Sequence, residues 1–267
     1  MVDEIIERLK AQRGNKYISG EAAEMASWCL EFIYQGDWEF MFEESAKTIE
    51  MRQLARETGL YPWLHVPLYP DHHYAPLVSL ADLFFYVRFI EQFQPRTILE
   101  LGTAGTGTAH LLSWLFPDVR IIGVDIDEKS PEHYRYLESL RPSNVELVMG
   151  DVNLIFNKLV EEHRPDFIII DYEHRYESSF RIARWCVGNG VKFAIHDVNC
   201  EVEEALAAAE CMLMSGLSYF KTASAMGIFF GIPSKDGGDH RCLRFNARFG
   251  SLRPAQTSHV KPANITD

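Results

Sequence analysis

Short apolar runs alternate with helical stretches from residue 97 to residue 232, and this alternation limits the possible folds more than any other feature. Continuous apolar strands that alternate with helices are typical of a parallel sheet covered by helices on both faces. The last two runs are separated by only Ser224 and Ala225, so we expect an antiparallel hairpin there. The sequence therefore predicts an α/β fold with a mostly parallel seven-stranded sheet and an antiparallel last strand. The seven runs lie at 97–101, 120–126, 145–149, 166–171, 191–196, 217–223 and 226–232.

The chain before residue 77 has a different character. Apolar residues at helical spacing predict helices across 1–60, including 21–34 and 38–58. The segment 61–77 contains four prolines, four aromatic residues and three histidines. Because proline fixes φ and removes a backbone donor, this segment is predicted to be a loop. We expect three regions: a helical N-terminal region with a substrate lid at 1–76, the sheet domain at 77–233, and a basic tail at 234–267.

Charge and cysteine content exclude several classes of partner. The chain has 26 Lys and Arg against 38 Asp and Glu, a formal net charge of −12, which disfavours a nucleic-acid partner. Five cysteines form no CxxC pair, which is typical of reduced thiols in a cytoplasmic protein. No apolar run approaches the ~20 residues of a membrane span, and the charged stretch MVDEIIERLK does not resemble a signal peptide. The basic tail is expected to lie on the surface or to contact a second copy of the chain.

The first apolar run leads into the glycine-rich sequence ELGTAGTGT at 100–108. Small residues after a strand let a ligand approach the backbone, and the N-terminus of the next helix offers N–H groups. The spacing is not GxGxxG, which weakens a nicotinamide interpretation. Asp125 lies 23 residues after Gly102, at the end of the second run, where a carboxylate can accept both hydroxyls of a ribose. A tight turn without a ligand is the alternative interpretation of the glycines.

Together, the sequence at 100–108, the GVDID at 123–127 and the GD at 150–151 resemble class I S-adenosylmethionine-dependent methyltransferases. The resemblance covers about residues 77–232 and implies a Rossmann-like sheet that binds S-adenosyl-L-methionine. Thr106 stands where many members of that family have glycine. The resemblance implies the following cofactor-binding residues: Glu100, Gly102, Thr103, Gly105, Gly107, Thr108, Asp125, Ile126, Asp151, Val152 and Asp171.

A second signature, DYEHRYE at 171–177 followed by HDVN at 196–199, is similar to macrolide-sugar O-methyltransferases and cephalosporin-hydroxylase-like proteins. That resemblance implies a divalent metal, Mg or Mn, held by Asp171, His196 and Asp197. Parallel strands end at one edge of the sheet, so these side chains can converge there. Oxygen ligands suit Mg²⁺ or Mn²⁺, and Mn²⁺ tolerates an imidazole better. Relatives that bind Mg²⁺ often have an acidic residue where this chain has His196.

The predicted reaction is methyl transfer to a hydroxyl of a small acceptor of the kind found in secondary metabolism. His174 lies three residues after Asp171, where it could take the hydroxyl proton, so both are candidate catalytic residues. Aromatic and imidazole side chains of the lid are candidates for acceptor contacts. These are Trp63, His72, His73 and Tyr74.

Each candidate has a structural alternative. Asp171 could cap the next helix, His174 could be a solvated loop residue, and 61–77 could be a strap packed on the core. His196 and Asp197 could be a structural pair that closes the fifth strand. At the level of function, the alternatives are a hydroxylase-like or other reaction on the same fold, and a catalytically silent scaffold that binds cofactor.

Overall fold

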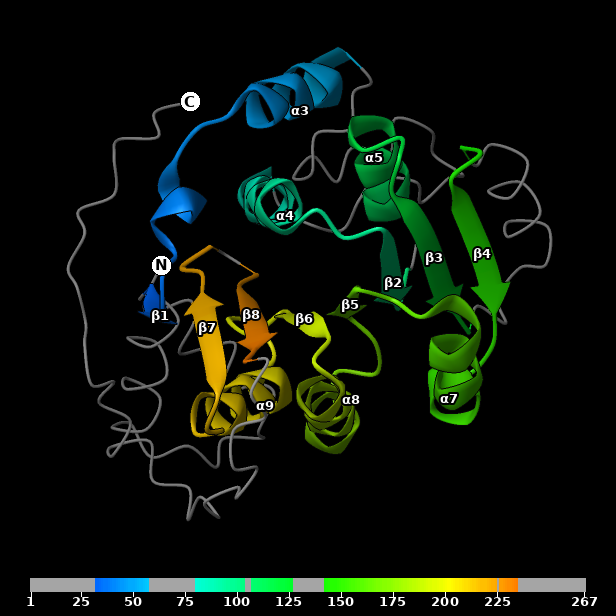
Figure 1. Ribbon diagram of the computed structural model, residues 1–267, viewed down its shortest axis with the longest axis vertical. Helices are drawn as coiled ribbons and strands as arrows, with labels where there is room; N and C mark the ends of the chain where they lie inside the picture. The colour runs from blue at the N-terminus through cyan, green and yellow to red at the C-terminus, as the bar shows by residue number, and fades with distance from the viewer. Residues whose placement is uncertain (1–31, 58–79, 104–106, 127–141, 225, 235–267) are drawn as a thin grey trace. The chain divides into compact units, whose positions relative to one another are not determined.

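The computed structural model describes residues 32–57, 80–103, 107–126, 142–224 and 226–234 (Figure 1). Several predictions therefore lie outside the described residues. They concern the helices before residue 32, the loop at 61–77 and the basic tail.

Eight strands form one sheet, in the order β1-β7-β8-β6-β5-β2-β3-β4. Strand β2 pairs in parallel with both β3 and β5, and β3 pairs in parallel with β4. Strands β7 and β8 pair antiparallel, as the short separation of the last two runs predicted. The strands are β1 Ile33–Gln35, β2 Thr97–Leu101, β3 Arg120–Asp125, β4 Val145–Met149, β5 Phe167–Ile170, β6 Lys192–His196, β7 Leu217–Lys221 and β8 Ile228–Pro233.

Helices separate most of these strands along the chain. The described helices are a 3-10 turn at Glu39–Phe42, α3 Ala46–Glu57, α4 Leu80–Phe93, α5 Gly107–Leu115, α7 Val152–His163, α8 Tyr176–Asn189 and α9 Val202–Met212. Within the described part of the chain, none of these helices has both the length and the apolar character needed to cross a membrane. The alternation of strands and helices confirms the predicted α/β class.

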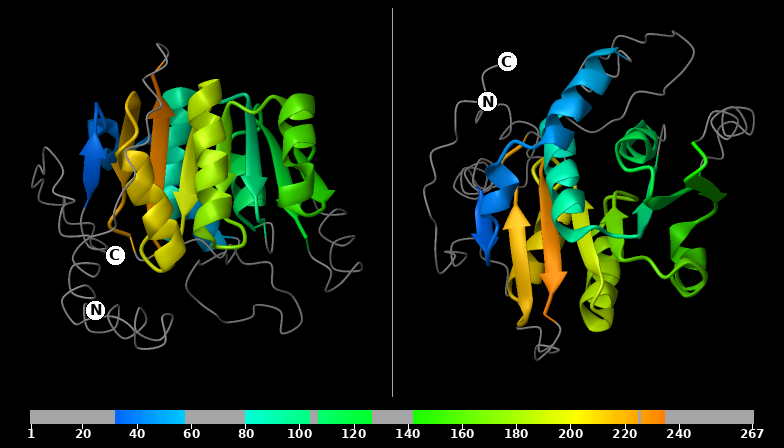
Figure 2. Two further views of the ribbon diagram at one scale, coloured as in Figure 1. Left: turned by 90° about the horizontal axis from the view of Figure 1, so that it is seen from below. Right: turned by 45° about the horizontal axis from the view of Figure 1, so that its top comes forward.

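The described residues belong to two compact units. One contains Glu43–Glu173 and Val191–Ala194, and it includes strands β2 to β5. Helices α5 and α7 lie on opposite faces of the β2–β3–β4 part of the sheet (Figure 1, Figure 2). Strand β2 is central in this unit because the chain passes from β2 to β3 on one side and later returns to β5 on the other. Ligands in open α/β sheets bind at such a reversal, beyond the carboxyl ends of the strands.

Burial from both sides explains the apolar strands of this unit. All four residues of β5 are buried, as are the last four of β2. The ring of Phe89 on α4 lies 4.6 Å from that of Phe167 at the start of β5, centroid to centroid. Each large apolar side chain removed from water in this way contributes about 1.5–3 kcal/mol.

The other unit contains His174–Gly190 and the described parts of Met1–Phe42 and Ile195–Asp267. Helices α8 and α9 pack against each other, α8 also contacts β8, and α9 contacts β7. Rings from the N-terminal segment surround Phe220 on β7, with centroids 5.5 to 6.1 Å away; they belong to Phe32, Tyr34, Trp38 and Phe42. This cluster attaches the N-terminal segment to the sheet.

Two helical predictions in the N-terminal region were wrong in detail. Ile33–Gln35, at the end of the predicted helix 21–34, form β1, which pairs antiparallel with β7 and adds an eighth strand. The predicted helix 38–58 is divided into the 3-10 turn and α3. Ser45 begins the second piece, because the Thr48 N–H donates to Ser45 Oγ at 3.1 Å and the Ser45 N–H to Thr48 Oγ1 at 2.8 Å. Reciprocal bonds of this kind satisfy the N–H groups at a helix start.

Candidate active site

The turn after β2 is held tightly against its neighbouring strands. Gly102 has φ +86°, and a Cβ at this position would overlap the carbonyl oxygen of Asp171. The N–H groups of Gly102 and Thr103 donate to Val124 O on β3 at 2.8 and 3.2 Å. Glycine is therefore required at 102 by the backbone itself, whether or not a ligand binds there.

The rest of the predicted glycine loop leads into α5. Gly107 is the first residue of that helix, and Thr108 is half-buried in its first turn. Gly105 lies outside the described residues. Two polar side chains of the predicted cofactor set, Glu100 on β2 and Thr103, are buried at 3% and 6% exposure. The first turn of a helix leaves backbone N–H groups without intrahelical partners, so this turn can bind a polar ligand.

The remaining predicted cofactor residues follow β3 and β4. Asp125 is the half-buried last residue of β3, and its backbone is paired in register with Met149. Ile126 follows it and is 54% exposed. Asp151 is the N-cap of α7, where its side chain accepts a hydrogen bond from the Asn153 N–H at 2.8 Å, and Val152 is buried. The carboxylate of Asp151 therefore stabilises the start of α7, whether or not a cofactor binds.

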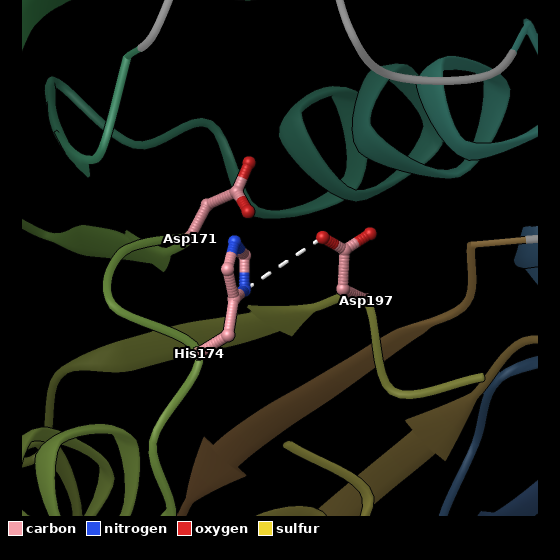
Figure 3. A group of neighbouring side chains, drawn as sticks. All are labelled: Asp171, His174 and Asp197. Carbon is pink, nitrogen blue, oxygen red and sulfur yellow. Dashed lines mark ion pairs between the residues drawn. The ribbon is translucent and has the colours of Figure 1, made fainter. Parts of the chain in front are cut away.

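A group of ionisable side chains lies at the turn after β5. Asp171, His174 and Asp197 each offer a ligand atom, and these atoms lie within 4.8 Å of one another (Figure 3). His174 Nδ1 lies 3.7 Å from Asp197 Oδ2, within ion-pair distance when the ring is protonated. The side chain of His174 is 39% exposed, so it is accessible to a small molecule. Two carboxylates and an imidazole are a donor set that a divalent cation can use.

Unusual backbone conformations position two of these side chains. Glu173 and His174 have φ values of 54° and 48°, and Asp197 has φ 60°. Non-glycine residues rarely adopt this left-handed region, and those that do often belong to functional sites. The turn 171–175 separates Asp171 from His174 by only two residues, which keeps both close to the end of β5.

His196 is the residue whose predicted role differs most from its position. It ends β6 and is 3% exposed, with Nδ1 3.2 Å from Asp197 Oδ1. The imidazole that groups with Asp171 and Asp197 is that of His174. The predicted metal set Asp171, His196 and Asp197 thus shares two of its three members with the group in the structure.

Asn199 anchors the segment that carries Asp197. Its Nδ2 donates to Thr222 O at 3.2 Å and to Ser224 O at 2.6 Å, in the turn between β7 and β8. Its backbone N–H donates to Met226 O at 2.8 Å. Gly227 has φ +80°, and a Cβ there would overlap the Asn199 side chain. The amide therefore fixes the chain directly after Asp197.

Sequence reasoning missed two residues at this site, Glu204 on α9 and Ser179 on α8. Both have 0% exposure, and Glu204 Oε1 lies 3.8 Å from His174 Nδ1. A signal for Glu204 existed: it shares the i, i+4, i+7 face of α9 with Ala208 and Cys211, which are buried. The predicted acceptor contacts lie outside the described residues; they are Trp63, His72, His73 and Tyr74.

No protein-family model and no curated protein matches the chain. Solved structures do match it. A Staphylococcus aureus protein assigned as a caffeoyl-CoA O-methyltransferase aligns over 72% of this chain and 93% of its own, with 15% identity and a TM-score of 0.51. A Klebsiella pneumoniae protein assigned as an O-methyltransferase aligns over 72% and 91%, with 16% identity and a TM-score of 0.49. A Podospora anserina methyltransferase with bound S-adenosylhomocysteine aligns over 82% and 97%, with 13% identity and a TM-score of 0.49.

The Staphylococcus aureus likeness is one of fold. At 15% identity it confirms the predicted Rossmann-like sheet with a reversed last strand. The chemistry of this chain has to be argued from its own residues.

Proposed function

We propose that the protein is an S-adenosylmethionine-dependent O-methyltransferase that acts on a hydroxyl of a small acceptor. The group Asp171, His174 and Asp197 carries this proposal, because a protein that only binds a cofactor does not need convergent ionisable side chains. The name of the Staphylococcus aureus protein with this fold, an O-methyltransferase, supports the same reaction class.

The turn after β2 and the end of β3 fit the cofactor. Backbone N–H groups at the start of α5 would face its polar methionine part, and the half-buried Asp125 would accept hydrogen bonds from the ribose hydroxyls. Asp151 and Val152, at the start of α7, would border the adenine. When bound, the cofactor supplies a methyl group whose carbon–sulfur bond breaks with its electron pair left on sulfur.

His174 would act on the acceptor. Its Nδ1 faces Asp197, so Nε2 is the nitrogen that would take the hydroxyl proton and leave a more nucleophilic oxygen. Asp171, three residues before His174, would help orient the acceptor so that its oxygen and the methyl carbon are aligned. The lid residues Trp63 and Tyr74 remain our predicted contacts for an aromatic or sugar acceptor.

The donor set also fits a divalent cation, because carboxylates and an imidazole suit Mg²⁺ or, better, Mn²⁺. Asp171 and Asp197 would hold it, with His174 or His196 as the imidazole ligand. A cation there would favour ionisation of the acceptor hydroxyl, as zinc does for bound water.

Methyl transfer from radiolabelled S-adenosylmethionine, with catechol and sugar acceptors, tests the proposal. We expect label in a product, and we expect EDTA to abolish turnover while S-adenosylhomocysteine still binds in calorimetry. Asp171→Asn and Asp197→Asn should each lower turnover at least about tenfold. The matched control is Asp118→Asn, an exposed aspartate before the amino end of β3, which should keep full turnover.

The possible failures are distinguishable. Binding of S-adenosylhomocysteine without transfer to any acceptor would favour the silent scaffold. Full turnover in EDTA, with no metal in the active sample, would exclude the cation and leave His174 as a metal-free base. Absence of cofactor binding would overturn the proposal as a whole.

A further inference from the structure

Glu204 is a completely buried carboxylate that the proposed reaction does not use. It lies on α9 at 0% exposure, and a buried charge is costly unless other groups satisfy it. Ser179 Oγ, also fully buried, donates a hydrogen bond to Glu204 Oε1 at 2.8 Å. The same oxygen lies 3.8 Å from His174 Nδ1.

His174 therefore has two carboxylates on one side of its ring. Nδ1 lies 3.7 Å from Asp197 Oδ2 and 3.8 Å from Glu204 Oε1. Figure 3 shows Nδ1 turned toward Asp197 and the other ring nitrogen turned toward the single carboxylate of Asp171. Carboxylate oxygens accept hydrogen bonds and do not donate them when ionised, so this pair favours a proton on Nδ1.

The position of Glu204 is set by helix packing. Ser179 lies on α8, in the turn that follows His174 and begins that helix, and α8 packs directly on α9. The neighbouring Glu203 also ties the two helices, because its Oε2 accepts from the Tyr176 N–H at 3.4 Å. Glu204 is thus held in place while the side chain of His174 is 39% exposed.

We propose that Glu204 is a positioning residue for His174, which keeps the proton of the neutral ring on Nδ1 and leaves Nε2, the nitrogen that faces Asp171, as the basic one. At 3.7 and 3.8 Å the two carboxylate oxygens are at ion-pair distance from Nδ1 and too far for hydrogen bonds, so they bias the position of the proton through their charge. The catalytic consequence rests on the function proposed above, but the tautomer does not. An unprotonated Nε2 beside Asp171 serves either a proton transfer or a cation, so the inference holds for both versions of the site.

The test is Glu204→Gln in the full chain. Glutamine keeps the size and can still accept from Ser179, but it removes the charge. Long-range proton–nitrogen NMR of histidine-labelled protein reports the tautomer, and the His174 signal is identified by its loss in His174→Asn. We expect the population with the proton on Nδ1 to fall and kcat to drop about 10- to 100-fold. The affinity for S-adenosylhomocysteine should stay within about twofold, because no predicted cofactor residue changes.

Two further variants serve as a control and as a substitute for Glu204→Gln. Glu203→Gln, a change of the adjacent exposed glutamate, should leave both the tautomer and kcat unchanged. Ser179→Ala should shift the tautomer in the same direction by less, and it replaces Glu204→Gln if that variant fails to melt cooperatively. An unchanged tautomer in folded Glu204→Gln and in Ser179→Ala would overturn the inference. A changed tautomer in a protein that transfers no methyl group would support the inference and contradict only the proposed function.

Discussion

Asp125 is the single side chain on which cofactor recognition should depend most. It is half-buried at the carboxyl end of β3, where one carboxylate can accept both ribose hydroxyls. Asp125→Ala removes charged hydrogen bonds, so S-adenosylhomocysteine affinity should fall by about 1–3 kcal/mol in calorimetry. Asp118→Ala, near the opposite end of the same strand, is the control and should bind as the unchanged protein does. Equal affinities for all three proteins would remove Asp125 from the site.

At the scale of single residues, strand ends were the informative positions in the sequence. Asp171 and Asp197 were predicted to be close because the strands before them are parallel and buried, and the structure groups them. Glu204 was missed because it lies in a helix between another glutamate and several alanines. Adjacent glutamates in a first turn are commonly solvated there. Only the packing of α8 on α9 distinguishes buried Glu204 from exposed Glu203.

The segment after β6 is the element whose geometry matters most for the proposed reaction. Asp197 begins it in a left-handed conformation, and Asn199 ties it to the turn between β7 and β8. Asn199→Ala leaves two carbonyl oxygens without this donor, so we expect a loss of about 1–3 kcal/mol in the free energy of unfolding. Turnover should fall as well, because Asp197 is no longer held in place, while S-adenosylhomocysteine affinity should persist.

Asn189→Ala provides a matched control for that element. Asn189 is exposed at the end of α8, and its Nδ2 donates only locally, to Trp185 O at 2.8 Å among the described contacts. Its removal should change stability by less than about 0.5 kcal/mol. Chemical denaturation of both variants measures the difference, and equal stabilities would show that Asn199 does not anchor the segment.

The elements themselves were predictable where burial imposed a pattern. The seven predicted runs correspond to β2 through β8, because each contains buried apolar residues and is longer than three residues. Strand β1 was missed because three residues are too few to establish a period of two within a region of helical spacing. It forms through pairing with β7, more than 180 residues later in the chain, and through the rings around Phe220. No local pattern encodes contacts of that kind.

At the scale of the whole molecule, the predicted site residues divide between the two compact units. Every described residue of the predicted cofactor set belongs to the unit Glu43–Glu173, whereas His174, His196 and Asp197 belong to the other unit. Alternation of strands and helices predicts the class of sheet, but it does not specify on which side of β2 each later strand joins. The observed order, with β3 on one side of β2 and β5 on the other, is what gives the Gly102 turn its position at the reversal.

The proposed cofactor binding leads to a prediction about the stability of the full chain. A ligand that binds only the folded state raises the free energy of unfolding by about 2.7 kcal/mol at 100 times its dissociation constant. S-adenosylhomocysteine at that concentration should therefore raise the melting temperature by about 5–10 °C in calorimetry. EDTA should not reduce this shift, because Asp171 is the one described residue of the predicted cofactor set that also belongs to the group of Asp171, His174 and Asp197.

The dependence on Asp125 makes the thermal test quantitative. If Asp125→Ala weakens binding tenfold, the same ligand concentration should stabilise that variant by only about 1.4 kcal/mol, so roughly half of the shift should remain. Asp197→Asn should keep the whole shift, since its predicted ligand is the acceptor or a cation. An equal loss in both variants would mean that cofactor and acceptor residues form one binding site. No shift in the unchanged protein at saturating ligand would contradict cofactor binding itself.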